Sequence, residues 1–487
     1  MSIALAFASV LGRVGYVIFS NAYTVSDSYN YYSVTVAVST PQLYYTDGSR
    51  ITNNVKSYKA VIRPVTADLA EVNKHFSKKE ASKITAELSK GYPVVRSINT
   101  NDTKLKTFKV YDTDTTLSQL ISDKSSGFLS YANLKPSKLK VSYLVDAKGR
   151  ILAGDEGREE SLGYYSREGY ILTIDKDVQE AASKAAENLK SGCVIVMDAK
   201  TASILACVNK PDDTFINKAF TNYSVGSVFK IVVAACALEN DVDINYDCTG
   251  SITVGDTTYT CQKEHKHGYQ NLNTALANSC NCYFVNLALT LGGDKLLDTA
   301  NALGFSSEIC LFDNWNITSS RLPSKTELNS KGELALMGFG QGKLVSTPLQ
   351  ICSALCTISN SGEKNTPFLV KAKKEVNGSI TEFKSSQGKR VISKKTADTL
   401  LDYLHNVVKN GTAKNAQTKS DKSAGKTATA QTGQFIDGRE LYNTWFAGVY
   451  PYDNPEYCIV VMCQDGTSGA ADCCPVFRTV VEKLEKR

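Results

Sequence analysis

The sequence predicts a mixed α/β (α+β) fold in which a small mixed region, residues 25–165, precedes a larger domain, residues 166–487. Three observations favour this organisation. Apolar, strand-like segments occur at both ends of the larger region and helical segments lie between them, so both ends are predicted to supply edge strands of one sheet. Shorter strand and helix patterns fill the small region. Residues 1–24 form a separate, almost uncharged segment.

Length and composition exclude several other classes of protein. The chain has 487 residues, of which 42% are hydrophobic and 21% charged, so it can bury a large core and is not disordered throughout. Lys and Arg number 55 and Asp and Glu 49, which leaves a net charge of +6. This excess is too small in so long a chain to indicate a nucleic-acid partner.

The first segment is predicted to be a membrane anchor, residues 1–24. It begins MSIALAFASVLGRVGYVIFS, with Arg13 as its one charge. Twenty helical residues span about 30 Å, which is enough to cross a bilayer. Two alternatives stay open: a signal peptide cleaved near Ser20-Asn21-Ala22, or a buried helix. With an anchor, the protein is expected at the cell membrane as a single-pass protein, with the rest of the chain on one side.

The small region alternates strand and helix patterns. The segments 31–39 and 57–64 alternate apolar and polar residues and are rich in Val and Tyr, which predicts strands. Residues 66–90 read as helical, with a solvated Lys/Glu face. A stretch rich in Gly and charge at 148–167 predicts the domain boundary.

The larger region opens with a predicted strand, 170–176, an Ala-rich helix, 176–190, and a hairpin, 192–208. An apolar helix follows at 227–239. Three successive strands are predicted near the end of the chain, at 426–435, 443–451 and 457–464. A final helix is predicted at 475–487, with cations at its C-terminal end, as the helix dipole favours.

The fourteen cysteines are mostly expected in the core, as small hydrophobic residues. None has CxxC spacing, so the sequence gives little support to a structural zinc site. Cys248 and Cys261 flank TGSITVGDTTYT, a hairpin pattern that brings its ends together. A disulfide between them and a pair of free thiols are both left open. His265 and His267 are expected in a solvated loop, because no third metal ligand is near in sequence.

The main chemical signal is Gly226-Ser227-Val228-Phe229-Lys230. Ser227 and Lys230 are three residues apart and share one face of the predicted helix. A serine hydroxyl becomes a good nucleophile when a neighbouring base takes its proton, and burial lowers a lysine pKa enough for this role. The apolar segment that follows is suited to burying Lys230, although a single SxxK occurs often by chance.

Two further triplets strengthen this signal. Ser279-Cys280-Asn281 begins an apolar stretch, and Lys426-Thr427-Ala428 opens a predicted strand about 200 residues after Ser227. In this order the three triplets match the SxxK, SxN and KTG set of penicillin-recognising serine acyltransferases. Residues 165–487 resemble a penicillin-binding protein of the class B type. The resemblance implies a serine β-lactamase/transpeptidase-like domain, a central antiparallel sheet flanked by helices, behind a pedestal domain.

The resemblance also implies roles for the matched residues. Ser227 is the acylated nucleophile, Lys230 takes its proton, and Ser279 relays a proton to the leaving amine. Asn281 holds the substrate amide and positions Lys230. Lys426 and Thr427 bind the substrate carboxylate, and the backbone N–H groups of Ser227 and Thr429 form the oxyanion hole.

Two details of the KTA triplet depart from the family pattern or allow another interpretation. Ala428 stands where the family usually has Gly, which adds a methyl group next to the substrate strand; activity is expected to survive and β-lactam affinity to change. Gly425-Lys426-Thr427 also resembles part of a P-loop, but Ser420 occupies the position of its required Gly.

The expected function is a membrane-anchored serine D,D-transpeptidase that cross-links peptidoglycan stem peptides and is inhibited by β-lactam antibiotics. No metal or cofactor is implied. One alternative keeps the site but makes the protein a D,D-carboxypeptidase, a β-lactam sensor or a β-lactamase. Another is a non-enzymatic scaffold, in which residues 25–165 bind a membrane-embedded glycan polymerase. The catalytic domain is expected on the outer face of the membrane.

Overall fold

The computed structural model describes Val10, Tyr16 and residues 31–124, 127–152, 154–212, 216–384 and 388–487. The chain forms two compact units. The first contains the chain up to Gln42, Thr52–Asp114 and Lys135–Arg167. The second contains Leu43–Ile51, Thr115–Leu134 and Glu168–Arg487.

The division differs from the expected boundary in one respect. Two segments from before residue 166, Leu43–Ile51 and Thr115–Leu134, belong to the second unit. Their apolar side chains explain this, because Leu43, Ile51 and Phe128 are buried in the hydrophobic core of that unit.

The expected membrane helix at residues 1–24 lies outside the described residues, apart from Val10 and Tyr16. Across the part of the chain that the structure describes, none of the helices combines the length and the apolar character needed to cross a bilayer.

The first unit is built from two small antiparallel sheets and a helix pair. The expected strands at 31–39 and 57–64 are present as β1 and β3. The single helix expected at 66–90 is two helices, because the chain is extended at Phe76 and Ser77 and the Ser77 side chain caps the second helix by accepting from the Glu80 N–H. The elements are β1 (Tyr31–Val38), β6 (Lys138–Leu144) and β7 (Arg158–Glu160); β4 (Val94–Ile98), β3 (Val55–Ile62) and β5 (Lys106–Asp112); α2 (Thr66–His75) and α3 (Lys78–Leu88).

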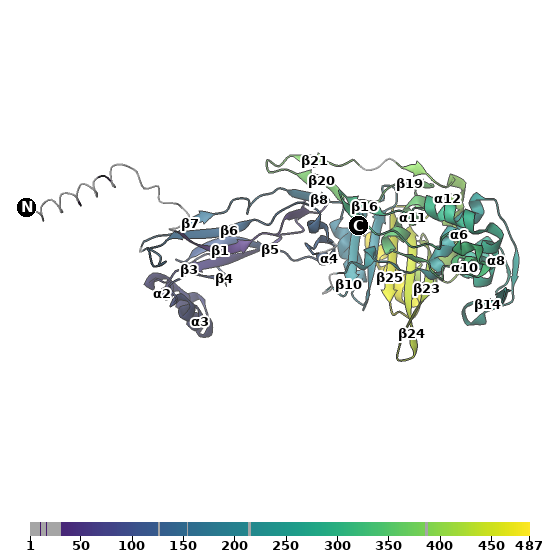
Figure 1. The fold of residues 1–487 in the computed structure, drawn as a ribbon, viewed down its shortest axis with the longest axis horizontal. Coiled ribbons are helices and arrows are strands. Elements are labelled where there is room, and N and C mark those ends of the chain that lie inside the picture. The colour runs from purple at the N-terminus through teal and green to yellow at the C-terminus, as the bar shows by residue number, and fades with distance from the viewer. Residues whose placement is uncertain are drawn as a thin grey trace, which may run out of the picture. The chain divides into compact units, whose positions relative to one another are not determined.

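A five-stranded antiparallel sheet forms the centre of the second unit (Figure 1). The predicted N-terminal hairpin supplies one edge and the predicted C-terminal strands supply the other, which confirms the expected sheet. The strand order is β10 (Ile204–Lys210), β9 (Gly192–Asp198), β25 (Tyr457–Gln464), β24 (Arg439–Tyr450) and β23 (Ala424–Ile436).

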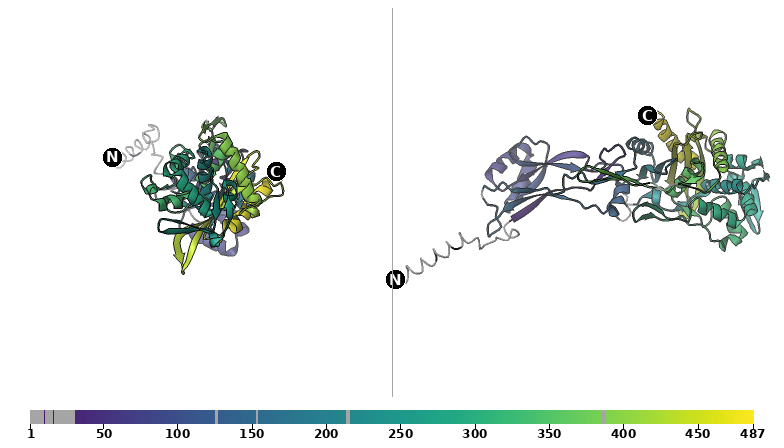
Figure 2. Two further views of the ribbon diagram at one scale, coloured as in Figure 1. Left: turned by 90° about the vertical axis from the view of Figure 1, so that its right-hand side faces the viewer. Right: turned by 90° about the horizontal axis from the view of Figure 1, so that it is seen from above.

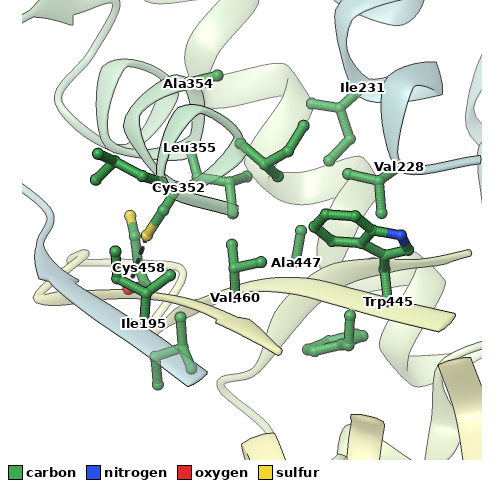
Figure 3. Close-up of a cluster of buried hydrophobic side chains, with 14 of the residues drawn as sticks. Ile195, Val228, Ile231, Cys352, Ala354, Leu355, Trp445, Ala447, Cys458 and Val460 are labelled. Atoms are coloured by element: carbon green, nitrogen blue, oxygen red, sulfur yellow. Dashed lines mark hydrogen bonds between the residues drawn. The ribbon is translucent and has the colours of Figure 1, made fainter. Parts of the chain in front are cut away.

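Helices cover both faces of this sheet. Trp445 and Ala447 of β24 face a cluster of buried side chains that includes Leu355 of α11 (Pro348–Ser359), as Figure 3 shows. Phe446, which points to the opposite face, stacks edge-on against Phe477 of α13 (Cys474–Leu484), with ring centroids 4.7 Å apart. The predicted last helix is α13. α5 (Lys176–Ala185) packs beside it, and β8 (Gly169–Leu172) precedes α5.

The helical part of the second unit carries the expected apolar helix at 227–239. Its first turn is a 3₁₀ helix, η3 (Gly226–Phe229), and it continues as α6 (Lys230–Glu239). Nearly all of α6 is buried, since other helices surround it. Its neighbours include α7 (Leu272–Ala277), α8 (Asn281–Leu291), α9 (Gly293–Ala302) and α12 (Lys394–Lys409), and α10 (Lys331–Gly338) packs on α8.

The hairpin of β23 and β24 extends beyond the neighbouring strands in Figure 1 and in the left view of Figure 2. Its tip is solvated and carries exposed Phe435 and Ile436. The opposite, buried end of β23 holds Lys426, so the edge of the sheet continues directly into the site described next.

Candidate active site

Ser227 lies in a tight turn that packs against the edge strand β23. Gly226 has φ +56°, and a Cβ placed there would lie only 3.0 Å from Cβ of Ala430 and 3.4 Å from Cβ of Ala428. Glycine is therefore required both by the backbone conformation and by the close approach of the strand. The indole N–H of Trp445 donates to the Ser224 carbonyl at 3.0 Å and holds the chain just before the turn. Ser227 itself is half-buried.

Lys230 begins α6, one turn after Ser227, and its side chain is 0% exposed. Its Nζ donates to the Ser279 carbonyl at 2.8 Å, to Ser279 Oγ at 3.2 Å and to Asn281 Oδ1 at 2.7 Å. Burial lowers the pKa of Lys230 from 10.5 to about 7. A large fraction of the amine is therefore neutral near pH 7, as a general base must be.

Ser279 and Asn281 lie in the turn between α7 and α8. Ser279 has φ +53°, which is unusual for a residue with a side chain and turns its carbonyl toward Lys230. Asn281 is the first residue of α8, and its Nδ2 donates to the Thr260 carbonyl at 2.9 Å. The Asn281 amide is therefore held at one end by β14 (Thr257–Thr260) and accepts from Lys230 at the other.

Lys426 lies on β23, with its side chain buried. Its Nζ donates to the carbonyl of Thr427 at 3.0 Å. Burial and, to a smaller extent, the charge of Lys230 hold the pKa of Lys426 well below its usual 10.5. The two amines are thus close enough to influence each other, although their residues are far apart in sequence. Thr429, farther along β23, is half-buried.

Ala428 contributes its methyl group to packing. Its residue is 4% exposed and lies on the same face of β23 as Lys426 and Ala430, against Gly226. Gly226 therefore makes room for a side chain at position 428.

Thr412 and Gly340 complete the frame of the site and were not singled out in the sequence. Thr412 Oγ1 lies 2.9 Å from Thr427 Oγ1, and the Thr412 N–H donates to the carbonyl of Ala277 at 3.1 Å. A Cβ on Gly340 would lie 1.9 Å from the Gly226 carbonyl oxygen, so this glycine permits the turn to pack. The run Gly338-Phe339-Gly340-Gln341-Gly342 is the one sequence signal that could have indicated it.

The P-loop interpretation of Gly425-Lys426-Thr427 is wrong. These residues lie inside the extended strand β23, whereas a phosphate-binding loop joins a strand to a helix N-terminus.

The predicted hairpin between Cys248 and Cys261 is present as β13 (Ser251–Val254) and β14. The disulfide is not formed: both cysteines are free and their Sγ atoms are 3.7 Å apart. The solvated-loop expectation for His265 and His267 rested on the lack of a third metal ligand nearby in sequence. His265 is exposed, as expected, whereas His267 is half-buried and its Nδ1 lies 3.5 Å from Cys248 Sγ.

Residues 192–482 match the family model described as the penicillin-binding protein transpeptidase domain. This match covers more than half of the chain. The chain belongs to the penicillin-binding transpeptidase family. The three triplets quoted from the sequence all lie within the matched residues.

Two curated relatives of this penicillin-binding protein illustrate the similarity. Stage V sporulation protein D of Bacillus subtilis is 29% identical over 361 residues, 68% of this chain and 54% of the relative. The peptidoglycan D,D-transpeptidase FtsI homolog of Mesostigma viride is 28% identical over 363 residues, 64% of this chain and 60% of the relative. The matched regions thus span between half and two thirds of these relatives.

Solved structures share the fold. The D,D-transpeptidase domain of a peptidoglycan glycosyltransferase from Eggerthella lenta superposes with a TM-score of 0.67 at 22% identity, over 93% of this chain and 99% of that one. Penicillin-binding protein A of Mycobacterium tuberculosis, as a ceftriaxone acyl-enzyme, gives a TM-score of 0.60 at 22% identity, over 65% of this chain and 80% of that one.

Proposed function

We propose that the protein is a serine D,D-transpeptidase that cross-links peptidoglycan stem peptides and is acylated by β-lactams. The observation that carries this proposal is the environment of Lys230: a buried amine one turn after Ser227, with a pKa near 7, held by Ser279 and Asn281. Family membership and the names of the relatives support the same activity.

In the first half of the reaction, Lys230 takes the proton of the Ser227 hydroxyl while the oxygen attacks the carbonyl of the D-Ala-D-Ala bond. The N–H groups of Ser227 and Thr429 stabilise the oxyanion, an effect worth ~3–4 kcal/mol per donor in comparable enzymes. Ser279 passes a proton to the departing amine, the C–N bond breaks and D-Ala leaves. The stem peptide is then an ester on Ser227.

In the second half, an amine from a neighbouring stem peptide attacks the ester and Ser227 recovers its proton. Lys426 and Thr427 bind the terminal carboxylate of the donor before acylation. β23 is an edge strand, so an extended stem peptide has free backbone partners along it.

Labelling with a fluorescent penicillin tests the acylation step. We expect the wild-type chain to be labelled and the tryptic peptide that contains Ser227 to gain the mass of the penicilloyl group. Ser227→Ala should abolish the label, whereas the matched control Ser224→Ala, three residues earlier, should keep it. Absence of label on the wild-type protein, or unchanged label on Ser227→Ala, would contradict the proposal.

The fate of the acyl group separates transpeptidase from hydrolase. A synthetic stem pentapeptide and an acceptor amine should give cross-linked product, and the penicilloyl adduct should last for hours. Release of D-Ala without cross-linked product would instead indicate a carboxypeptidase, and loss of the adduct in seconds would indicate a β-lactamase.

The proposal extends to where the protein works. We propose that residues 1–24 anchor it to the cell membrane by a single pass, with the transpeptidase unit on the outer face, and that the first unit binds a membrane-embedded glycan polymerase. The apolar sequence of residues 1–24 supports the anchor. Fractionation of cells that express the chain with and without these residues tests it, and crosslinking from the first unit tests the partner.

A further inference from the structure

A cluster of sulfur and imidazole side chains lies directly behind the Ser279–Asn281 turn. Ligand atoms of Cys248, Cys261, His267 and Cys280 all lie within 4.8 Å of one another. The three cysteines are buried and His267 is half-buried. Within the described residues, no other group of three or more His, Cys, Asp or Glu side chains meets this spacing.

Four separate chain segments supply these ligands. Cys248 ends β12 (Tyr246–Cys248), and Cys261 follows the β13–β14 hairpin. His267 precedes β15 (Gly268–Gln270), which pairs with β12 so that Gly268 lies opposite Cys248. Cys280 is the N-cap of α8. The hairpin and the β12–β15 pair therefore bring residues up to 32 positions apart to one point.

The distances suit metal coordination and not a disulfide. Sγ of Cys261 lies 3.7 Å from Sγ of Cys248 and 3.8 Å from Sγ of Cys280. Tetrahedral Zn–S bonds of about 2.3 Å separate two sulfurs by about 3.8 Å. A disulfide needs a sulfur separation of about 2.05 Å, far shorter than either distance.

We propose that Cys248, Cys261, His267 and Cys280 bind one zinc-class divalent cation. Each thiol loses its proton to solvent as its sulfur binds the metal, and His267 binds as the neutral imidazole. Four protein ligands complete a tetrahedral site, so the cation is structural and takes no part in acyl transfer. Cys282, whose Sγ accepts from the Cys261 thiol at 3.5 Å, lies beside the site but outside the ligand set.

The site lies next to the Ser279–Asn281 turn, so a bound cation would stabilise that turn. Cys280 lies between Ser279 and Asn281, the two residues that hold the Lys230 amine. A bond from the metal to Cys280 fixes the backbone of this turn, in which Ser279 has the left-handed φ of +53°. The metal thus couples the outer hairpin, residues 251–260, to the geometry around Lys230.

Metal analysis of the full-length protein tests this proposal without reference to its activity. The wild-type chain, purified under reducing conditions without chelator, is expected to hold about one zinc ion per chain by mass spectrometry of the metal. Cys248→Ser, Cys261→Ser and His267→Ala should each lose most of it. The matched control Cys352→Ser changes a buried cysteine that donates to the Cys458 carbonyl and should retain it.

A second measurement covers variants that fail to fold. Removal of the metal from the wild-type protein with a chelator should lower its thermal midpoint by several degrees, and Zn²⁺, but not Mg²⁺, should restore it. Co²⁺ substitution should add the sulfur-to-metal charge-transfer absorption of a site with three thiolates.

Three results would overturn the proposal. The first is a wild-type protein that holds no zinc after expression with added zinc. The second is a mass two hydrogens below the reduced value, with Cys248 linked to Cys261. The third is full zinc in His267→Ala together with its loss in Cys282→Ser, which would disprove this ligand set.

Discussion

Nζ of Lys230 lies 2.7 Å from Oδ1 of Asn281, although 51 positions separate the two residues in the sequence. The contact joins the first residue of α6 to the first residue of α8. The Ser279–Asn281 turn therefore positions the general base of the proposed reaction. Five predictions follow from this arrangement and from the strand beside it.

The first prediction concerns Lys230. Replacement by Ala should slow acylation by a β-lactam by about 10³-fold, because no other amine one turn after Ser227 can take its proton. The matched control Lys394→Ala removes an exposed lysine that pairs with Asp398 and should acylate normally. Stopped-flow measurement of the acylation rate checks this, and a loss of less than about tenfold would contradict a role as base.

The pH profile tests the same residue. The pKa of Lys230 is lowered to about 7, and only the neutral amine accepts a proton. The acylation rate should therefore rise with pH and level off above about 7, and fall about tenfold per unit at lower pH. A profile that is flat from pH 5 to 9 would be inconsistent with this chemistry.

Asn281 gives a directional test of the electrostatics. Asn281→Asp keeps the shape of the side chain but places a carboxylate 2.7 Å from the Lys230 amine. An opposite charge favours the protonated lysine, so the acylation profile should move to higher pH by one unit or more. Asn281→Ala should instead slow acylation roughly 10- to 100-fold, since a hydrogen bond to a charged group contributes about 1.5–3 kcal/mol.

Ala428→Gly restores the residue usual in the family and tests where the methyl group acts. Because this methyl is buried against Gly226, acylation should change by less than about threefold. The free energy of unfolding should fall by about 1–2 kcal/mol, from the lost methyl and the greater flexibility of Gly in a strand. A gain in acylation of tenfold or more would place the methyl in the path of the substrate.

Thr412→Val tests the support of Thr427. The change keeps the shape but removes the hydroxyl 2.9 Å from Thr427 Oγ1. A neutral hydrogen bond contributes about 1 kcal/mol, so kcat/KM for acylation should fall about fivefold, mainly through KM. Thr412→Ser retains the hydroxyl and should restore it. Equal losses in both variants would point to packing of the methyl group instead.

Much of the second unit was predictable because its strands and helices carry their own patterns. The hairpin at 192–208 and the three strands after residue 424 are apolar runs bounded by turn residues. Each of these segments forms a strand in the structure, as its local pattern predicts. The prediction of a single helix at 66–90 was wrong. The chain is extended at Phe76 and Ser77, and the Ser77 side chain caps a second helix.

Ser227, Lys230, Ser279, Asn281 and Lys426 were all selected from the sequence, since each belongs to a short motif with fixed spacing. Thr412 and Gly340 were missed, because their importance lies in what they touch. The structure groups Leu43–Ile51 and Thr115–Leu134 with the second unit, and no local pattern indicates this because the core that they join is formed by distant residues.

The sequence by itself determined which residues form the proposed site and the order of the elements that carry them, because both follow from local residue types and spacing. Only the tertiary structure decided how those groups behave. Burial on every side lowers the pKa of Lys230, and the pairing of β12 with β15 gathers thiols and His267 that the sequence left as separate residues. Burial and proximity depend on contacts between segments distant in the chain, which no local pattern records.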